Sequence, residues 1–147
     1  MPASPIERDE RLGRGVFSSR VPKRIREYGI LPPTRFLESD FSSASSDVSM
    51  DRLDKADCVE LTKIQDAYGQ KRRLPRKLQG WLHCPAFVFQ DKGWPVEASP
   101  VLEPPNGLLA NPYHSHIQID EKGRMGALDI IRAGIGKWKW QPRCDPE

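Results

Sequence analysis

The sequence lacks any apolar run near the roughly 20 residues needed to cross a bilayer. Its first residues also lack the hydrophobic stretch of a secretory signal. Cysteine is scarce, since Cys58, Cys84 and Cys144 are odd in number and widely spaced. These features argue against a disulfide framework and favour reduced thiols. We therefore expect a cytoplasmic protein that does not span a membrane.

Several catalytic and cofactor motifs are absent as well. The chain contains no Cys-x-x-Cys or His-Glu-x-x-His zinc motif, no Gly-x-Ser-x-Gly nucleophile elbow and no phosphate-binding glycine loop. His83 and Cys84 are adjacent, but neighbouring residues on a strand point to opposite faces and cannot form a nucleophile–base pair. The sequence thus favours a non-enzymatic protein and leaves an enzyme open as an alternative.

Proline and glycine are abundant, with 14 and 11 residues in a chain of 147. Both interrupt regular structure, so helices and strands should be short. Hydrophobic residues make up 37% and charged residues 29%, a composition that fits one small-cored domain. We predict a single domain over residues 11–140, with a flexible leader at 1–10 and a tail at 141–147.

Apolar residues spaced by three and four predict short helices at 21–28, 55–68 and 127–134. In the longest of them, Asp54 is placed to cap the N-terminus, and Cys58 should face the core as a small apolar side chain.

The segments between the first two helices are rich in residues that favour loops. After Pro32 and Pro33, an extended stretch is expected to insert Phe36 or Leu37 into the core. The serine-rich residues 39–47 are expected to form a mobile loop, because serine and aspartate side chains compete for backbone hydrogen bonds.

Alternation of apolar and polar residues predicts strands near Val16, near Ser49 and over most of 78–119. Residues 78–89 and 95–102 are expected to pair as a hairpin. The predicted fold class is α+β, a mainly antiparallel sheet packed on one face by two or three short helices.

The last predicted strand carries two histidines. His114 and His116 share one face, opposite Ile117 and Ile119. Two imidazoles on one face can share a metal ion such as zinc if a third ligand, for example His83, lies nearby. A His-based metal-binding protein is therefore one alternative, and general acid or base use of one histidine is another.

Three clusters of basic residues indicate a binding surface. They are Lys23, Arg24 and Arg26 on the first helix; Lys71, Arg72, Arg73, Arg76 and Lys77 in a connector; and Lys137, Trp138, Lys139 and Trp140 near the end. Cations contact phosphates and interleaved aromatics stack on bases, although such residues also form solvated loops or pack into a core. The main hypothesis is a non-enzymatic binding or accessory protein that engages nucleic acid or an acidic protein partner.

The order of elements resembles that of ADP-ribosyltransferases: a strand with Arg14, a helix, a strand with Ser49, a helix, and a β-rich half with Glu97 and Glu121. That family uses an arginine or histidine on an early strand, a small hydroxyl residue on the next and a later glutamate to hold NAD and its ribose. The resemblance implies an NAD-using enzyme with these residues at its site. If the protein is an enzyme, His114 and His116 are further candidate catalytic residues through general acid or base use. The family's serine–threonine–serine and paired-acid motifs are missing here. No cofactor is favoured, with NAD and zinc as alternatives.

The runs Arg14…Pro33…Phe36…Val48-Ser49 and Asn111-Pro-Tyr-His114 also resemble small uncharacterised bacterial proteins of the defence or mobile-element type. No activity accompanies that likeness. It implies a compact bacterial domain.

Overall fold

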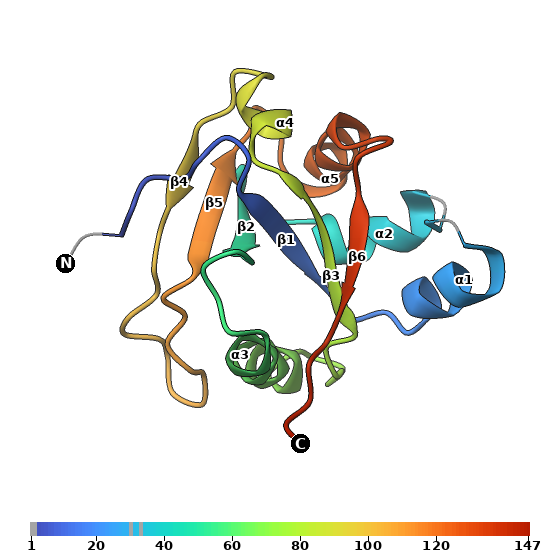
Figure 1. Ribbon diagram of the computed structural model, residues 1–147, viewed down its shortest axis with the longest axis vertical. Helices are drawn as coiled ribbons and strands as arrows, with labels where there is room; N and C mark the ends of the chain where they lie inside the picture. The colour runs from blue at the N-terminus through green and yellow to red at the C-terminus, as the bar shows by residue number, and fades with distance from the viewer. Residues whose placement is uncertain (1–2, 30, 33) are drawn as a thin grey trace.

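Six strands form one antiparallel sheet in the computed structural model, which describes residues 3–29, 31–32 and 34–147, without the side chains of 34–36. The strands are β1 (Arg11–Val16), β2 (Asp47–Arg52), β3 (Gly80–Pro85), β4 (Val96–Ala98), β5 (His114–Gln118) and β6 (Lys139–Pro142). Their order is β4-β5-β2-β1-β3-β6, so the N-terminal strand is central and β4 and β6 form the two edges (Figure 1).

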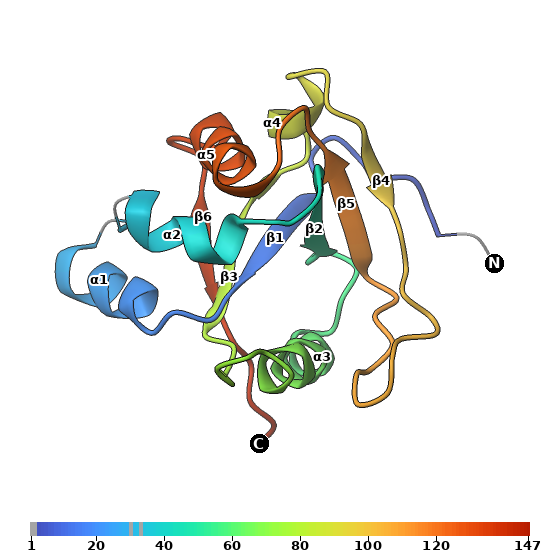
Figure 2. The same cartoon turned by 180° about the vertical axis from the view of Figure 1, so that it is seen from behind.

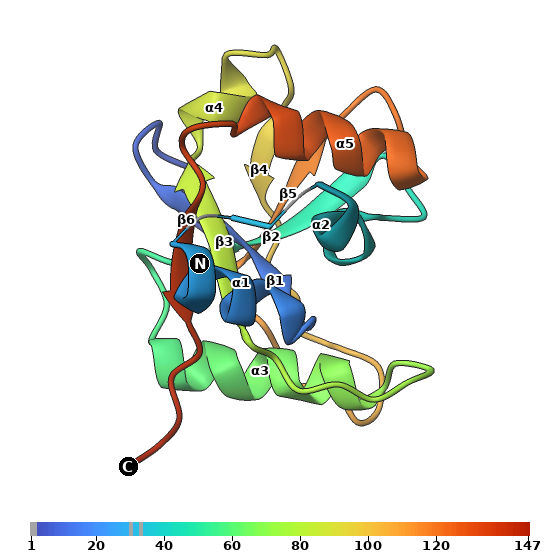
Figure 3. The same ribbon diagram turned by 90° about the vertical axis from the view of Figure 1, so that its right-hand side faces the viewer.

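Helices cover both faces of this sheet. They are α1 (Arg20–Tyr28), α2 (Thr34–Phe41), α3 (Cys58–Gln70), α4 (Phe87–Gln90) and α5 (Gly123–Ala133). Figure 3 shows α2 and α5 on one side of the strands and α3 on the other. The prediction of an α+β fold with an antiparallel sheet is confirmed, whereas the prediction that the helices share one face is wrong.

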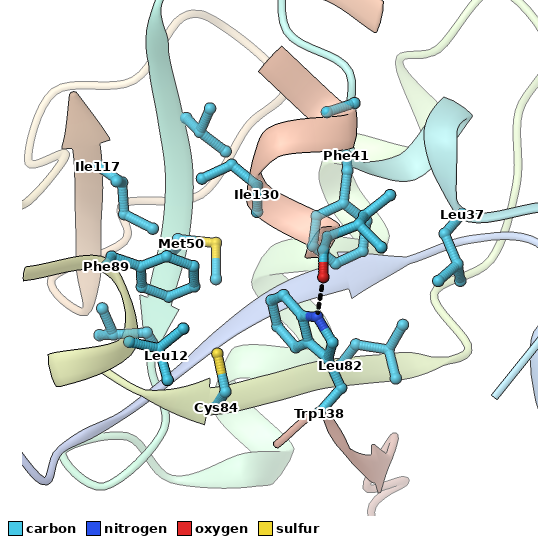
Figure 4. Close-up of a cluster of buried hydrophobic side chains, with 14 of the residues drawn as sticks. Leu12, Leu37, Phe41, Met50, Leu82, Cys84, Phe89, Ile117, Ile130 and Trp138 are labelled. Atoms are coloured by element: carbon cyan, nitrogen blue, oxygen red, sulfur yellow. Dashed lines mark hydrogen bonds between the residues drawn. The ribbon is translucent and has the colours of Figure 1, made fainter. Parts of the chain in front are cut away.

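The larger core lies on the α2 and α5 side. Leu12 and Leu82 of neighbouring strands face Phe41 of α2 and Ile130 of α5 there, all of them almost fully buried (Figure 4). Trp138 closes this core, and its indole N–H donates a 2.9 Å hydrogen bond to the carbonyl of Ile131. Buried tryptophan N–H groups need such a partner, so Trp138 is a core residue and not part of a binding surface.

A smaller core lies under α3. Leu61 and Ile64 of that helix pack against Trp81 of β3 and against Leu78. The N-terminus of α3 is capped by Asp57, whose carboxylate accepts from the backbone N–H of Val59 at 3.0 Å. The helix predicted at 55–68 is therefore present but begins later, and Asp54 does not cap it.

The expected hairpin of 78–89 with 95–102 is wrong. Strand β3 ends at Pro85 and pairs with β1 and β6, and residues 87–90 turn into α4. In the second half, residues 96–98 pair with β5. Proline ends the ladder of β3 because it has no N–H to donate.

Residues 34–41 form α2 where an extended segment and the start of a mobile loop were expected. Leu37 and Phe41, four residues apart, bury the same helix face, a contact that outweighs the loop preference of Ser39 and Asp40. Pro33 and the side chain of Phe36 lie outside what the structure describes. The serine-rich stretch is fixed locally too, since the hydroxyls of Ser43 and Ser45 both donate to the carbonyl of Asp47.

Both ends of the described chain are attached to the domain. Glu10 forms a buried ion pair with Arg52, so the leader is not loose along the whole of 1–10. In the tail, Arg143 pairs with Asp66 at 2.7 Å. The structure also joins Cys58 to Cys144 by a disulfide, which corrects the expectation of three reduced thiols and leaves Cys84 as the buried free cysteine.

No helix in the described ranges combines the length and apolar character needed to cross a membrane.

Candidate active site

The central strands separate soon after they begin to pair. β1 and β2 are joined in register at Leu12↔Arg52 and Gly13↔Asp51, whereas β1 and β3 remain paired along their full length. The next residue of β1, Arg14, stands at the point of divergence. Its guanidinium donates to the Ser49 carbonyl at 2.7 Å, so Arg14 bridges two strands that the ladder no longer joins.

Arg14 is held by backbone carbonyls. Its Nε donates to the carbonyl of Asp40 at 2.7 Å, and one terminal nitrogen donates to that of Ser42 at 3.5 Å. Three hydrogen bonds use three of the five N–H groups of a guanidinium, so two remain for a ligand. Burial lowers the pKa of Arg14, opposed by the charges of Asp51 and Asp40, but an arginine of this kind remains a cation.

A cleft of about 420 Å³ opens where the strands separate, between the end of α2 and the second half of α3. This volume is in the range of small-molecule sites in proteins. The lining residues include the cations Arg14 and Arg72, the carboxyl groups of Asp40 and Asp51, and His114. Hydroxyl groups of serine and tyrosine side chains, among them Ser49 and Tyr68, complete its polar lining.

Asp51 is the most deeply buried acidic group of the cleft, with 2% exposure. Its carboxylate accepts hydrogen bonds from Trp81 Nε1 at 3.0 Å, from Gln65 Nε2 at 2.8 Å and from Asn111 Nδ2 at 3.0 Å. Desolvation raises the pKa of Asp51 despite these donors. Because its partners come from α3, β3 and the loop before β5, Asp51 fixes the walls of the cleft.

Asp40 has a free acceptor. Its Oδ1 accepts from the backbone N–H of Phe17 at 3.1 Å, and its Oδ2 is buried without a hydrogen-bond partner in the part of the chain that the structure describes. Desolvation raises the pKa of this carboxyl group, which favours its uncharged form. Buried polar atoms are normally paired, so this unpaired oxygen adds to the cost of desolvating the carboxyl group.

His114 has a defined orientation. Its Nδ1 lies 2.9 Å from the carbonyl oxygen of Ser99 and 2.8 Å from the hydroxyl of the same residue. A carbonyl only accepts, so Nδ1 carries the proton and Nε2 of the neutral ring is the basic atom. Burial lowers the pKa of His114, which keeps the ring neutral near pH 7. Among the described residues, Nε2 has no hydrogen-bond partner.

Strand register adds a second row of polar residues beside the cleft. Ser49, His116 and Glu97 are direct neighbours across β2, β5 and β4. His116 Nε2 lies 3.7 Å from Glu97 Oε2. Side chains opposite one another in a ladder share a face, so this row runs from the cleft to the sheet edge. Of the residues expected from the sequence, Arg14, Ser49 and His114 line the cleft, and His116 and Glu97 lie in the row beside it.

Two predicted residues lie elsewhere. Glu121 is exposed in the turn before α5. His83 is on β3, separated from β5 by β1 and β2, so it cannot complete a zinc site with His114 and His116. Within the described ranges, no three histidine, cysteine or acidic side chains are positioned to hold a metal ion.

The three basic clusters do not form one surface. Lys137 lies over the ring of Phe87 near α4, at the opposite end of the molecule from the connector after α3 (Figures 1 and 2). Arg24 lies over Tyr28 on α1. In the connector, Arg72 lines the cleft and stacks on Phe17, with its carbon 4.7 Å from the ring centre.

Local sequence patterns did not single out Asp40, Asp51 or Asn111. Asp51 follows Ser49 by two residues on a strand, so the two share a face, and this was the available signal. Comparisons with protein-family models, with curated proteins and with solved structures find no match for this chain.

Proposed function

We propose that the cleft between β1 and β2 binds NAD and that the protein transfers the ADP-ribose group, as the resemblance to ADP-ribosyltransferases implies. One observation carries the proposal: Arg14 and Ser49 line a single cleft, and the Arg14 guanidinium donates to the backbone carbonyl of Ser49 at 2.7 Å. Residue type and chain order suggested this pair, and strand separation gives it a cavity. Glu97, the acidic residue of the pattern, lies two strands from Ser49 on the same face.

The residues of the cleft fit a ligand that has phosphates and hydroxyl groups. The two unused N–H groups of Arg14 suit the pyrophosphate, because a guanidinium binds phosphate oxygens in pairs. The hydroxyl groups of Ser49 and Tyr68, which line the same cleft, can pair with ribose hydroxyls. Burial raises the pKa of Asp40 and of Asp51, and the cations Arg14 and Arg72 line the same cleft as these two carboxyl groups.

Bound NAD would supply the reacting bond, which joins ribose C1′ to the nicotinamide nitrogen. When this bond breaks, its electron pair leaves with neutral nicotinamide, and C1′ bonds to a nucleophile. In this scheme His114 Nε2 accepts the proton of the nucleophile. Its neutral ring suits a base, and Ser99 holds the proton on the other nitrogen. Ser49 and Glu97 orient the ribose, while Arg14 holds the charged end.

The test is release of nicotinamide from NAD, with variants matched on the same strand. Arg14→Lys keeps the charge but removes the paired donors, and we expect at least a roughly 100-fold loss of rate, as for other electrostatic contacts to a reacting group. Arg11→Lys is the control, because Arg11 pairs with Asp54 outside the cleft. A wild-type protein that releases no nicotinamide above the uncatalysed rate overturns the proposal, as does an Arg14→Lys variant as active as Arg11→Lys.

NAD binding gives a separate readout. We expect NAD to raise the melting temperature of the wild type and of Arg11→Lys, but not of Arg14→Lys. An equal rise in all three proteins would place NAD outside this cleft.

A further inference from the structure

A second cavity, of about 580 Å³, adjoins the cleft. Phe17 and Ser39 line both cavities, so the two are direct neighbours. The second cavity is basic: Arg76 and Lys77 of the connector line it, facing Ser18 and Arg20 at the start of α1. A ligand that fills the cleft can therefore extend into a positively charged groove.

The fold builds this groove from local contacts. Gly69 near the end of α3 accepts from the backbone N–H of Arg76 at 3.1 Å, and a Cβ at Gly69 would lie only 2.1 Å from the Arg76 carbonyl. This close approach turns the connector back along α3 and fixes its direction. The side chains of Arg76 and Lys77 are exposed, and neither forms an ion pair in the described part of the chain. Their charge is available to a ligand.

Arg72 lines the first cavity and packs on Phe17, which lines both cavities. Its guanidinium covers the ring of Phe17 and lies 4.0 Å from Asp40 Oδ1. A guanidinium plane held over an aromatic ring is a surface on which a nucleobase can stack. The junction thus offers stacking, and the groove beyond it offers phosphate contacts.

We propose that the groove of Arg76 and Lys77 binds the phosphate backbone of a single-stranded nucleic acid, and that a nucleotide of this strand is the acceptor of ADP-ribose. The first part rests on the groove alone, and the second rests on the proposed function. An acceptor hydroxyl or base nitrogen loses a proton to His114 and forms the new bond to C1′. An acidic protein could also bind the positive charges of the groove, but only a nucleic acid has bases that stack on Arg72.

The binding test uses a fluorescent thymidine strand of about 12 nucleotides, titrated from about 50 to 200 mM salt. Arg76→Ala/Lys77→Ala should weaken binding by roughly tenfold at low salt and reduce the salt slope by about 1.4, at about 0.7 for each lost phosphate contact. The control, Lys55→Ala/Lys63→Ala, removes the same charge from exposed positions that do not line the groove and should bind as the wild type.

Three results overturn the groove: no binding of the strand by wild type at low salt, equal losses in both double variants, or equally tight binding of polyglutamate. The second part is tested with labelled NAD and the same strand, where we expect label on the strand. Label that stays off it while nicotinamide is released overturns the acceptor assignment and leaves the proposed function standing. Strand binding without any nicotinamide release overturns the proposed function and leaves the groove standing.

Discussion

Glu10 and Arg52 form a two-pronged ion pair in which Nε lies 2.6 Å from Oε2 and Nη2 lies 2.9 Å from Oε1. Both side chains are almost fully buried. Arg52 also donates to the carbonyls of Ser4 and Pro5, so a single arginine of β2 holds the segment that precedes β1.

We expect Glu10→Ala to lower the free energy of unfolding by about 3 to 5 kcal/mol, because it leaves the Arg52 charge buried and unpaired. Urea denaturation measures the change. Asp91→Ala is the control, since its pair with Arg8 is exposed and its loss should have little effect. Equal stability of Glu10→Ala and wild type would mean that the segment before β1 does not depend on Arg52.

Asp40→Asn should stabilise the protein at pH 7, by on the order of 1 kcal/mol, because it replaces a buried carboxylate, whose charge is disfavoured by desolvation, with a neutral amide of the same shape. The folded-state pKa of Asp40 is raised, so the wild type gains stability from it as pH falls toward the unfolded value of 3.8. The advantage of the variant should therefore shrink in acid. Denaturation of both proteins between neutral and acid pH tests this, and an advantage that is constant with pH contradicts it.

His83 should affect the pH dependence of stability in the opposite direction from Asp40. Desolvation lowers its pKa from 6.5 to about 4 in the folded protein. The unfolded chain then binds more protons between these values, so stability is present above pH 6.5 and is lost as pH falls toward 4. Between pH 6.5 and about 4, we expect the free energy of unfolding of His83→Gln to fall by about 2 kcal/mol less than that of the wild type, after allowance for partial solvent screening. Stability curves that stay parallel over this range would disprove the role.

The disulfide between Cys58 and Cys144 closes a loop with a sequence separation of 86. Reduction should lower the free energy of unfolding by about 4 to 5 kcal/mol, the loss expected for a loop of this size. Thiol titration of the unfolded protein should find one reactive group, Cys84, before reduction and three after it. Three before reduction would show that the protein carries free thiols, as its sequence suggested.

His114→Gln should reduce nicotinamide release by about 10² to 10⁴, the contribution of a general base. His83→Gln is the matched control, because that ring lies on β3 outside the cleft. The wild-type rate should fall in acid as His114 becomes protonated, and its lowered pKa places this fall below pH 6.5. A rate that is independent of pH in this range would remove His114 from the reaction.

Local patterns in the sequence correctly predicted the antiparallel α+β fold, the helices around α1, α3 and α5 and the strand with His114 and His116. These elements are encoded in apolar spacing over a few residues. The pairing of strands is not encoded in such local spacing. β3 pairs with β1, about 70 residues earlier, and periodicity contains no information on such a pairing. The helix α2 was missed because Ser39 and Asp40 suggested a loop, although Leu37 and Phe41 carried a helical signal.

The site was only partly accessible from the sequence for a related reason. Arg14 and Ser49 could be selected by residue type and chain order. Asp40 and Asp51 are chemically ordinary aspartates until tertiary packing buries them. Glu121 has the residue type that the resemblance required, but it lies beyond the end of β5.

The early separation of β1 and β2 divides the sheet into two halves that are joined by few residue pairs. Two register pairs, with Leu12 and Gly13 of β1, join a half made of β4, β5 and β2 to a half made of β1, β3 and β6. Arg14 belongs to one half, whereas Ser49, His114 and Glu97 belong to the other. A ligand that contacts residues of both halves would link them, so its binding should slow amide exchange along β2 and β1 together.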